Sequence, residues 1–214
     1  MTYCISDIHG CYDTFMALLD IIRFNPASDT LYILGDAIDR GRQPMECLMF
    51  IKKTSRVHFI LGNHEQMMLD YYDCKNDYWR RNDNEITKAQ LNSVTEYERD
   101  SILSYIRTRP YYKTVALNEK RFFLSHSGLA VGIPFKYQTP RDMVWGRKEF
   151  YQNKALHRYT CIFGHTPTPY IRRSKDCSVW FDPVHQDKIC IDCGYVHGGY
   201  LAAIRLDDGA VFYS

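Results

Sequence analysis

Apolar residues in the first third of the chain follow two alternating patterns. Residues 2–6, 30–34 and 57–61 are short runs rich in β-branched and aromatic side chains, which is typical of buried strands. Between them, residues 12–24 and 44–53 space their apolar side chains as amphipathic helices do. This order predicts a β-α-β arrangement with parallel strands and right-handed crossovers. Ligands of such sheets collect at the carboxyl ends of the strands.

A polar segment interrupts this pattern in the middle of the chain. Residues 70–92 are rich in Asp, Asn, Tyr and Arg and lack a clear period, so we expect an exposed loop that leads into a helix. Residues 94–110 regain helical spacing, and Pro110 marks the end of that helix. Several side chains of the 71–84 stretch could frame a substrate groove or cap the core, and the sequence leaves both open: Tyr71, Tyr72, Tyr78, Trp79, Arg80 and Arg81.

The second half of the chain predicts strands almost throughout. Residues 111–117 and 121–125 are joined by a short Asn-Glu-Lys turn, which favours a hairpin. Further β-rich runs occur at residues 160–164, 178–182, 188–192, 200–206 and 210–214. We therefore expect an α/β fold in which two mixed β-sheets pack as a sandwich flanked by helices, with the active site at the strand ends. Residues 1–214 are interpreted as a single domain.

Composition excludes some functional classes and leaves others open. Of the 214 residues, 24% are charged and 45% hydrophobic, which is ordinary for a globular protein and argues against disorder. A net charge of +2 gives no electrostatic reason to expect a nucleic-acid partner. Neither a basic, apolar leader nor a membrane-spanning run is present, so we expect no membrane partner and a cytoplasmic location. The oligomeric state stays open.

The eight cysteines do not predict disulfides. A protein kept in a reducing compartment holds its thiols free, and free cysteines behave as small buried hydrophobes. Cys190 and Cys193 form a CxxC pair, but a zinc ribbon requires a second pair, which the sequence lacks. We therefore interpret this pair as structural.

Five polar segments follow predicted strands and carry most of the metal-binding and acid–base side chains. Each combines Asp, Asn or His with a glycine, which permits a close approach of ligands to a shared centre. Asp7 and His9 flank Ile8, so extended backbone would point both polar side chains the same way. The segments are DIHG at 7–10, GDAIDRG at 35–41, GNHE at 62–65, SHSG at 125–128 and GHT at 164–166.

The donor atoms of these segments suit two divalent cations. Asp36 can share its carboxylate between two ions, Asn63 offers an amide oxygen, and the histidines supply nitrogen. Such a mixed set favours Mn, Fe or Zn over Ca or Cu(I), and we take Mn as the first expectation. Two ions about 3.5 to 4 Å apart can clamp an in-line displacement at phosphorus and generate hydroxide at neutral pH. The candidate ligands are Asp7, His9, Asp36, Asn63, His126 and His165.

Taken in order, these motifs resemble a known family. The segments SDIHG, GDAIDRG, GNHEQMM, VWGR and IFGHT are similar to the phosphoprotein phosphatase branch of the calcineurin-like metallophosphoesterases. They are most similar to the lambda-phage type of bacterial and viral protein serine/threonine phosphatase. Ser6 replaces the first glycine of the family's GDxHG, which is tolerable where the backbone is extended.

The resemblance implies a role for each motif residue. Two metals would be held by Asp7 and His9 on one side and by Asn63, His126 and His165 on the other, with Asp36 as the bridge. His64 would be the general acid, and Asp39 would orient it. Arg40 and Arg147 would bind the substrate phosphate, together with Asn63 and His64. The chemistry agrees, since histidine titrates near neutral pH and arginine presents a planar fork to phosphate oxygens.

The expected function is a metal-dependent phosphomonoesterase of the protein serine/threonine phosphatase type. The resemblance implies direct attack on phosphorus by a metal-bridging hydroxide, while His64 protonates the departing oxygen. The substrate would be a phosphorylated protein or peptide, or a small phosphate ester. One alternative is a symmetrical dinucleoside tetraphosphate hydrolase, although such enzymes usually have GNHD where residues 62–65 are GNHE. Another is a catalytically inactive binding module of the same fold.

The remaining polar residues receive structural interpretations. Glu65 lies in the first turn of a predicted helix, where the helix dipole favours a carboxylate. Histidines outside the motifs are expected to be surface or packing residues: His58, His157, His185 and His197.

Overall fold

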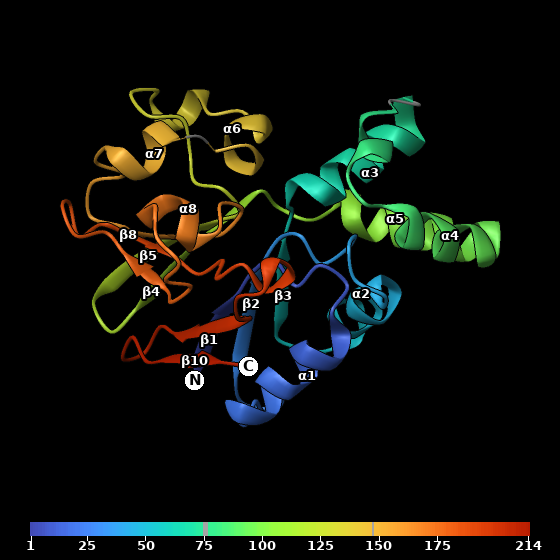
Figure 1. Ribbon diagram of the computed structural model, residues 1–214, viewed down its shortest axis with the longest axis horizontal. Helices are drawn as coiled ribbons and strands as arrows, with labels where there is room; N and C mark the ends of the chain where they lie inside the picture. Colours follow the sequence, from blue (N-terminus) through green and yellow to red (C-terminus); the bar gives the residue numbers. More distant parts are fainter. Residues whose placement is uncertain (75–76, 147) are drawn as a thin grey trace.

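The computed structural model describes residues 1–74, 77–146 and 148–214, and within these ranges two five-stranded sheets form the centre of the fold (Figure 1). The first sheet, in the order β10-β9-β1-β2-β3, contains β1 (Thr2–Ile5), β2 (Thr30–Leu34), β3 (Val57–Ile60), β9 (Ala202–Arg205) and β10 (Val211–Tyr213). The second, in the order β4-β5-β6-β8-β7, contains β4 (Tyr112–Leu117), β5 (Lys120–Ser125), β6 (Thr160–Phe163), β7 (Trp180–Phe181) and β8 (Lys188–Cys190). Both sheets mix parallel and antiparallel pairs, which confirms the expected fold class.

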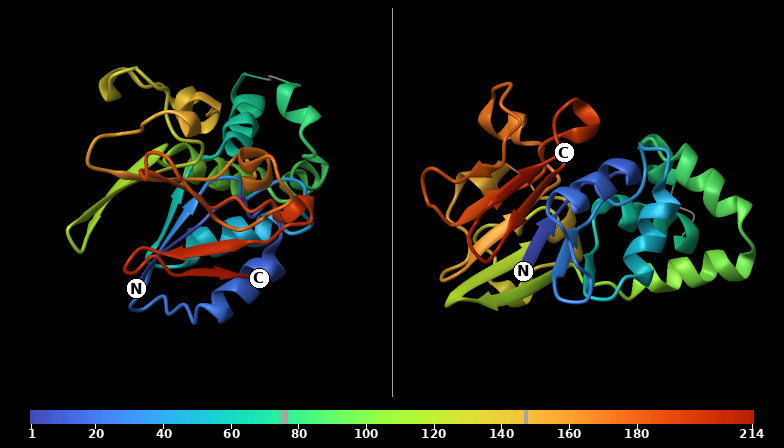
Figure 2. Two further views of the ribbon diagram at one scale, coloured as in Figure 1. Left: turned by 60° about the vertical axis from the view of Figure 1, so that its left-hand side comes forward. Right: turned by 90° about the horizontal axis from the view of Figure 1, so that it is seen from below.

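Helices cover the outer faces of both sheets (Figures 1 and 2). The first sheet carries α1 (Tyr12–Ile21), α2 (Pro44–Lys53), α3 (Asn63–Cys74) and α5 (Glu96–Arg107), with α4 (Glu85–Ser93) packed against α2. Three short helices lie on the side of the second sheet: α6 (Pro140–Val144), α7 (Lys148–Gln152) and α8 (Thr168–Arg172). Three short 3-10 helices complete the described elements: η1 (Asp77–Arg81), η2 (Phe135–Tyr137) and η3 (Tyr195–His197). Among the described residues no helix is both long and apolar enough to cross a membrane.

Alternation along the strands produces the layers. In β1, Cys4 packs in the apolar cluster between the two sheets, whereas Tyr3 and Ile5 pack in the cluster under the helices. In β5, Leu124 faces the first sheet and Phe123 faces the opposite side. Because successive side chains of a strand point to opposite faces, each strand serves two apolar layers at once. The result is a four-layer stack of helices, sheet, sheet and helices.

The expectation of an exposed loop over residues 70–92 is wrong. Helix α3 continues to Cys74, η1 follows at Asp77–Arg81, and α4 begins at Glu85. Trp79 is fully buried and packs beside the rings of Tyr71 and Tyr72. Polar residues dominate this stretch because few of its side chains are buried, so its helical period is hidden. Trp79, with Tyr71 and Tyr72 packed beside it, therefore caps the core, whereas Tyr78 is 51% exposed.

The other expected elements are found close to their predicted positions. Helix α5 begins with a capping box, in which Thr95 accepts from the backbone N–H of Glu98 and Glu98 accepts from that of Thr95. Cys190 and Cys193 are buried, unpaired thiols, as the structural interpretation expects. Strands β1, β2 and β3 run parallel, and so do β5, β6 and β8. Their carboxyl ends therefore carry all five motif segments.

Candidate metal centre

The loops that follow these strands are tied together by backbone hydrogen bonds. The N–H of Asp7 donates to the carbonyl of Gly35 at 3.2 Å, which joins the first two motif segments. The N–H of Gly164 donates to the carbonyl of His126 at 2.7 Å, which joins the last two. The N–H of His165 donates to Asp7 Oδ2 at 3.0 Å and so links the two sheets. The remaining segment, GNHE, is joined to the others by the N–H of His64, which donates to Asp36 Oδ1 at 3.1 Å, so the five segments form one site.

Left-handed backbone gives the first motif its shape. Asp7 (φ 53°) and His9 (φ 48°) both lie in the left-handed region, as do Asp36 and His165. The expectation that extended backbone aligns Asp7 and His9 is therefore wrong, although both side chains line the same cavity. Ser6 is not among the left-handed residues, so its replacement of glycine causes no strain there. Non-glycine residues are uncommon in this region of φ, and they often occur at functional sites.

Two motif glycines are required for close approach. A Cβ on Gly62 would lie 2.1 Å from Asp36 Oδ1, and a Cβ on Gly164 would lie 2.1 Å from Asp7 Oδ2. Neither glycine has a positive φ, so backbone freedom is not the reason for its presence. Any larger residue would displace a carboxylate of the site.

Glu65 has a larger structural role than its place in the first turn of α3 indicates. Its buried carboxylate accepts hydrogen bonds from four backbone N–H groups. They belong to Asp36 (2.9 Å), Ala37 (2.9 Å), Ile38 (3.3 Å) and Gly62 (3.0 Å). The side chain therefore fixes the loop after β2 against the start of α3. Charged acceptors make stronger hydrogen bonds than neutral ones, so this contact sets the position of Asp36.

Asp36 stands at the centre of the donor atoms. Its Oδ2 lies 3.4 Å from His126 Nε2, 3.7 Å from His9 Nε2 and 3.9 Å from His64 Nε2. Two groups of potential metal ligands share this carboxylate, one with His9 and His64 and the other with His126 and His165. A carboxylate between two such groups can serve both.

The second group of donors has lone pairs that face one another. His126 Nδ1 lies 2.8 Å from the carbonyl of Leu34, so Nδ1 carries the proton of the neutral ring and Nε2 presents a lone pair. That nitrogen lies 2.8 Å from Asn63 Oδ1 and 3.2 Å from His165 Nδ1. His9 is held in the same way, with Nδ1 3.0 Å from the carbonyl of Ile38. Rings fixed through one nitrogen and open at the other are typical of metal ligands.

The electrostatics of the centre also fit divalent cations. Burial raises the pKa of Asp7 well above its usual range, and Asp192 adds to this shift. Burial and the neighbouring Asp7 likewise raise the pKa of Asp36. Burial lowers the pKa of His9 and His126, which keeps both rings neutral and able to coordinate. The charge of Arg40 only partly offsets these raised pKa values, and bound divalent ions would supply further positive charge.

His64 forms a separate chain of hydrogen bonds behind the donor atoms. Its Nδ1 lies 2.7 Å from Asp39 Oδ2, which also accepts from Trp79 Nε1 at 2.7 Å. The N–H of Asp39 donates to Thr87 Oγ1 at 3.0 Å. With Nδ1–H held by the carboxylate, His64 turns Nε2 toward Asp36 and the cavity. Trp79 was not anticipated as part of the site, because its contact with Asp39 joins residues 40 positions apart.

The cavity over the donor atoms has a volume of about 170 Å³ and an exposed rim. Arg40 and His197 lie on this rim, with Nη1 and Nε2 3.3 Å apart. The structural interpretation of His197 is therefore incomplete, since the residue is exposed but lines the site. Asp192 also lines it, and burial raises the pKa of Asp192 to about 6. Asp192 follows β8 as Asp36 follows β2, and that position after a strand is the signal that could have identified it.

Arg147 lies outside the described residues, so its role as a phosphate ligand stays a prediction.

Comparison with known proteins identifies the family. The sequence pattern of the family described as "Calcineurin-like phosphoesterase" matches residues 2–199. The chain is a calcineurin-like phosphoesterase. This membership confirms the broader resemblance drawn from the motifs and makes the protein a hydrolase of the metallophosphoesterase type.

Several curated relatives of this calcineurin-like phosphoesterase carry the same description. The protein of Erwinia tasmaniensis is 34% identical over 130 residues, which cover 60% of this chain and 44% of the relative, and it is named "Bis(5'-nucleosyl)-tetraphosphatase, symmetrical". A protein of Citrobacter koseri with the same name is 34% identical over 143 residues, covering 66% of this chain and 47% of the relative. The chain thus spans slightly less than half the length of these relatives.

Solved structures of the same fold carry several different names. A candidate diadenosine tetraphosphatase superposes with a TM-score of 0.75 at 20% identity, covering 100% of this chain and 92% of the other. A serine/threonine phosphatase from Saccharomyces cerevisiae superposes with a TM-score of 0.62 at 13% identity, covering 100% and 78%. At such identities the likeness shows the fold alone, and the fold does not distinguish among substrates.

Proposed function

We propose that this calcineurin-like phosphoesterase hydrolyses dinucleoside tetraphosphates symmetrically, at the central linkage. The observation that carries the proposal is the shared name of its curated relatives, at 34% identity over 130 residues. The opposing signal was one residue, the glutamate of GNHE where such hydrolases usually have aspartate. Glu65 binds backbone N–H groups and does not face the cavity, so its identity bears on loop position more than on substrate. As an indicator of substrate, the shared name of the relatives is therefore stronger than the GNHE segment.

The metal-binding part of the proposal rests on the donor atoms described above. Asp7, His9 and Asp36 would hold one divalent ion, and Asp36, Asn63, His126 and His165 would hold the other. When bound, such ions lower the pKa of water and neutralise charge on phosphoryl oxygens. The buried, neutral rings of His9 and His126 keep their Nε2 lone pairs available for this purpose. Mn is the first expectation, with Fe or Zn as alternatives.

The general acid of the proposed reaction is His64. Hydrolysis adds water across the central P–O–P linkage, so one phosphorus gains the hydroxyl oxygen and the departing nucleoside diphosphate gains a proton. His64 Nε2 faces the cavity, while Asp39 holds Nδ1–H at 2.7 Å and fixes the ring orientation. Arg40 would bind the phosphate at the rim, and Arg147 is assigned the same role from the sequence alone.

Substrate comparison tests this function. Protein reconstituted with Mn would be supplied with diadenosine tetraphosphate, a phosphoserine peptide and p-nitrophenyl phosphate, and kcat/KM would be measured for each. We expect the dinucleotide to give the highest value and ADP to be the only nucleotide product. Formation of ATP and AMP would contradict symmetrical cleavage, and chelation with EDTA should abolish turnover of all three substrates.

A second candidate is the protein serine/threonine phosphatase predicted from the motif resemblance. The glutamate of the GNHE segment favours it. A higher kcat/KM for the phosphoserine peptide than for the dinucleotide would establish this candidate. Absence of turnover on every substrate, in protein that retains its metals, would instead indicate an inactive binding module.

A further inference from the structure

The cavity over the donor atoms is too small for a dinucleotide. Its volume is about 170 Å³, whereas sites that enclose drug-sized ligands measure roughly 300–1,000 Å³. It can hold the phosphate that reacts, together with metal ions. The rest of a dinucleoside tetraphosphate must therefore extend over the rim.

A groove beside α8 continues the cavity in one direction. Pro167 and His197 line both spaces, so the two are contiguous. The groove has a volume of about 650 Å³ and is bounded further out by Tyr170, Arg173 and Lys175. We call it the distal groove. Its size is sufficient for a nucleoside with part of a phosphate chain.

The distal groove presents free positive charge. Arg172 and Arg173 are adjacent in sequence, but Arg172 is used inside the fold, where it donates to the carbonyls of Ser178 and Val179 at 2.6 and 2.8 Å. Arg173 ends α8 in the left-handed region with φ 53°, and its side chain lines the groove. Within the described chain, neither Arg173 nor Lys175 forms an ion pair. Two unpaired cations are suited to a phosphate chain.

The same groove presents an aromatic ring. Tyr170 is 66% exposed although it is a large hydrophobic side chain. An exposed aromatic ring beside cationic side chains is the arrangement on which nucleic-acid bases stack. His197 lines both spaces, and Arg40 on the cavity side lies 3.3 Å from it, so a phosphate chain that passes from the groove into the cavity would pass close to the guanidinium of Arg40.

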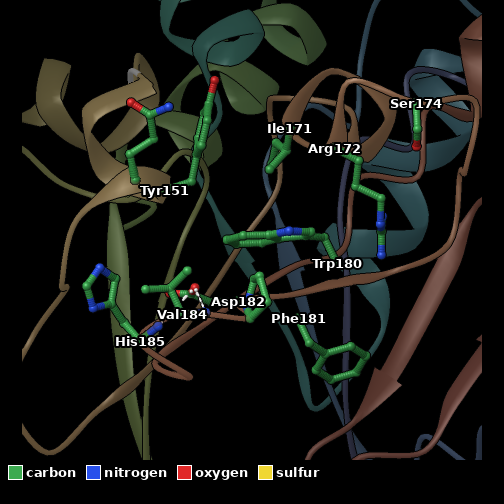
Figure 3. Close-up of a pocket in the computed structure, with 11 residues that line it drawn as sticks. Tyr151, Ile171, Arg172, Ser174, Trp180, Phe181, Asp182, Val184 and His185 are labelled. Carbon is green, nitrogen blue, oxygen red and sulfur yellow. Dashed lines mark hydrogen bonds between the residues drawn. The ribbon is translucent and has the colours of Figure 1, made fainter.

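A larger cleft on the second sheet lacks these properties. It has a volume of about 800 Å³, lies beside the edge strand β7 and shares no lining residue with the motif segments (Figure 3). Its charged groups are engaged, since Arg172 binds backbone carbonyls and Asp182 lies 2.6 Å from Lys188 Nζ. The distal groove is therefore the better match to an anionic nucleotide.

We propose that the distal groove binds the nucleoside and outer phosphate of one half of the substrate, with Tyr170 against the base and Arg173 and Lys175 on the phosphate. This inference rests on the proposed function. It assigns specificity to residues that take no part in metal binding. A small phosphate ester would not reach the groove.

Kinetics of four variants test the assignment in the Mn-loaded protein. Tyr170→Ala and the double variant Arg173→Ala/Lys175→Ala should each raise KM for diadenosine tetraphosphate about tenfold, because the first removes a base-stacking contact and the second removes two phosphate contacts. Turnover of p-nitrophenyl phosphate should stay unchanged. Tyr170→Phe should restore the wild-type KM. Lys154→Ala, at an exposed lysine that lines neither space, is the matched control.

The outcomes separate the two proposals. If the wild-type protein hydrolyses the dinucleotide but the variants keep its KM, the groove assignment is overturned and the proposed function stands. Equal losses on both substrates would also overturn it, because the groove would then not be selective. If the wild-type protein cleaves p-nitrophenyl phosphate but not the dinucleotide, both proposals fail. If the variants raised KM only for a phosphoserine peptide, the groove would be a peptide-binding site and the proposal that it binds a nucleotide would be overturned.

Discussion

The floor and the rim of the site are built in opposite ways. We use floor for the buried side chains Asp7, His9, Asp36, Asn63 and His126, and rim for Arg40 and His197. On the floor, His9 and His126 are each fixed through Nδ1 by a backbone carbonyl, and Asp36 is positioned by Glu65 through its loop. On the rim, both residues are exposed, and the contact between them measures 3.3 Å.

This difference separates reaction from substrate. A rigid, buried floor can impose the same phosphoryl chemistry on any phosphate that reaches it. An exposed rim can change without disturbing the floor, and it meets the parts of the substrate that differ. Floor motifs therefore identify the family, and we expect the rim to determine whether phosphopeptides or dinucleotides are preferred. Changes on the floor should accordingly alter kcat, and changes on the rim should alter KM.

The largest effect is expected from Asp36→Asn, because this carboxylate is shared by both donor groups. We expect metal content to fall at both positions and kcat to fall about a thousandfold or more. Elemental analysis of dialysed protein, together with turnover of p-nitrophenyl phosphate, measures this. Asp20→Asn, at an exposed position, is the control. Loss of one ion with near-normal turnover would show that Asp36 is not shared.

The same variant should be more stable than the wild type when metal is absent. The raised pKa of Asp36 means that the folded protein binds its proton more tightly than the unfolded chain does. The charged carboxylate therefore destabilises the metal-free fold above this pKa, and the penalty disappears as the pH falls toward the ordinary range of Asp. Thermal unfolding in EDTA should give a higher Tm for Asp36→Asn at pH 8 and a smaller difference at pH 5.

Glu65→Gln tests the floor without touching a ligand. Each carboxylate oxygen of Glu65 accepts from two backbone N–H groups, so two of them would face the new amide NH2 and the other two would lose a charged acceptor. The unfolding free energy should therefore fall by about 3 kcal/mol. Urea denaturation in EDTA measures the change. Glu149→Gln, at an exposed position of α7, should have almost no effect. A similar small effect at Glu65 would mean that its four contacts do not hold the loop.

His64→Asn should discriminate between leaving groups. General acid catalysis is worth roughly a hundredfold or more when the departing oxygen is strongly basic. Hydrolysis of a phosphoserine peptide, however slow, should therefore drop about a hundredfold, while p-nitrophenyl phosphate should lose much less. Metal content should remain at the wild-type value. Loss of a metal would make His64 a ligand instead, as its place near Asp36 also allows.

Trp79→Phe should have a moderate effect through the same chain of hydrogen bonds. The substitution keeps a large buried ring but removes the N–H that Asp39 accepts, and a hydrogen bond to a charged group is worth about 1.5–3 kcal/mol. We expect kcat for the phosphoserine peptide to fall about tenfold with little change in KM. Trp180→Phe is the control. If Trp79→Phe and Trp180→Phe changed kcat equally, Trp79 would contribute only through packing.

His197→Ala should give the smallest effect and should appear in KM. The residue contacts Arg40 at the rim and lies outside the proposed metal ligands. We expect KM for the dinucleotide to rise about threefold, which corresponds to a contact worth under 1 kcal/mol. The value of kcat and the metal content should not change. A fall in kcat would show that His197 takes part in the reaction and not only in substrate binding.

The strands and most of the candidate site could be predicted because their signals are local. Asp36 and Asn63 each follow an apolar run after a single glycine, so their place at a strand end is visible in a few residues. The helix at Glu85–Ser93 was missed because only Thr87 and Leu91 within it are buried, too few to reveal a period. The left-handed turn at Asp7 was missed because it depends on the carbonyl of Gly35, which another segment supplies.

Contacts between distant segments account for the remaining differences. The hydrogen bond from Trp79 to Asp39 and the place of Asp192 in the cavity exist only after the sheets have packed. Glu65 was correctly placed at a helix start, yet three of its four partners lie 27 to 29 positions earlier in the chain. The spacing of apolar residues carries information only about neighbours within about two turns of a helix, so it cannot identify such distant partners.

Dependence on distant partners also sets the order of events during folding. The bond between His165 and Asp7 spans 158 positions, and that between His126 and Leu34 spans 92. Contacts of such separation form late, since the loop they close must be ordered first. The first sheet can assemble its parallel strands without them, but the full set of donor atoms exists only after both sheets have docked. Divalent ions would then bind the finished fold and slow its unfolding, rather than guide the chain toward it.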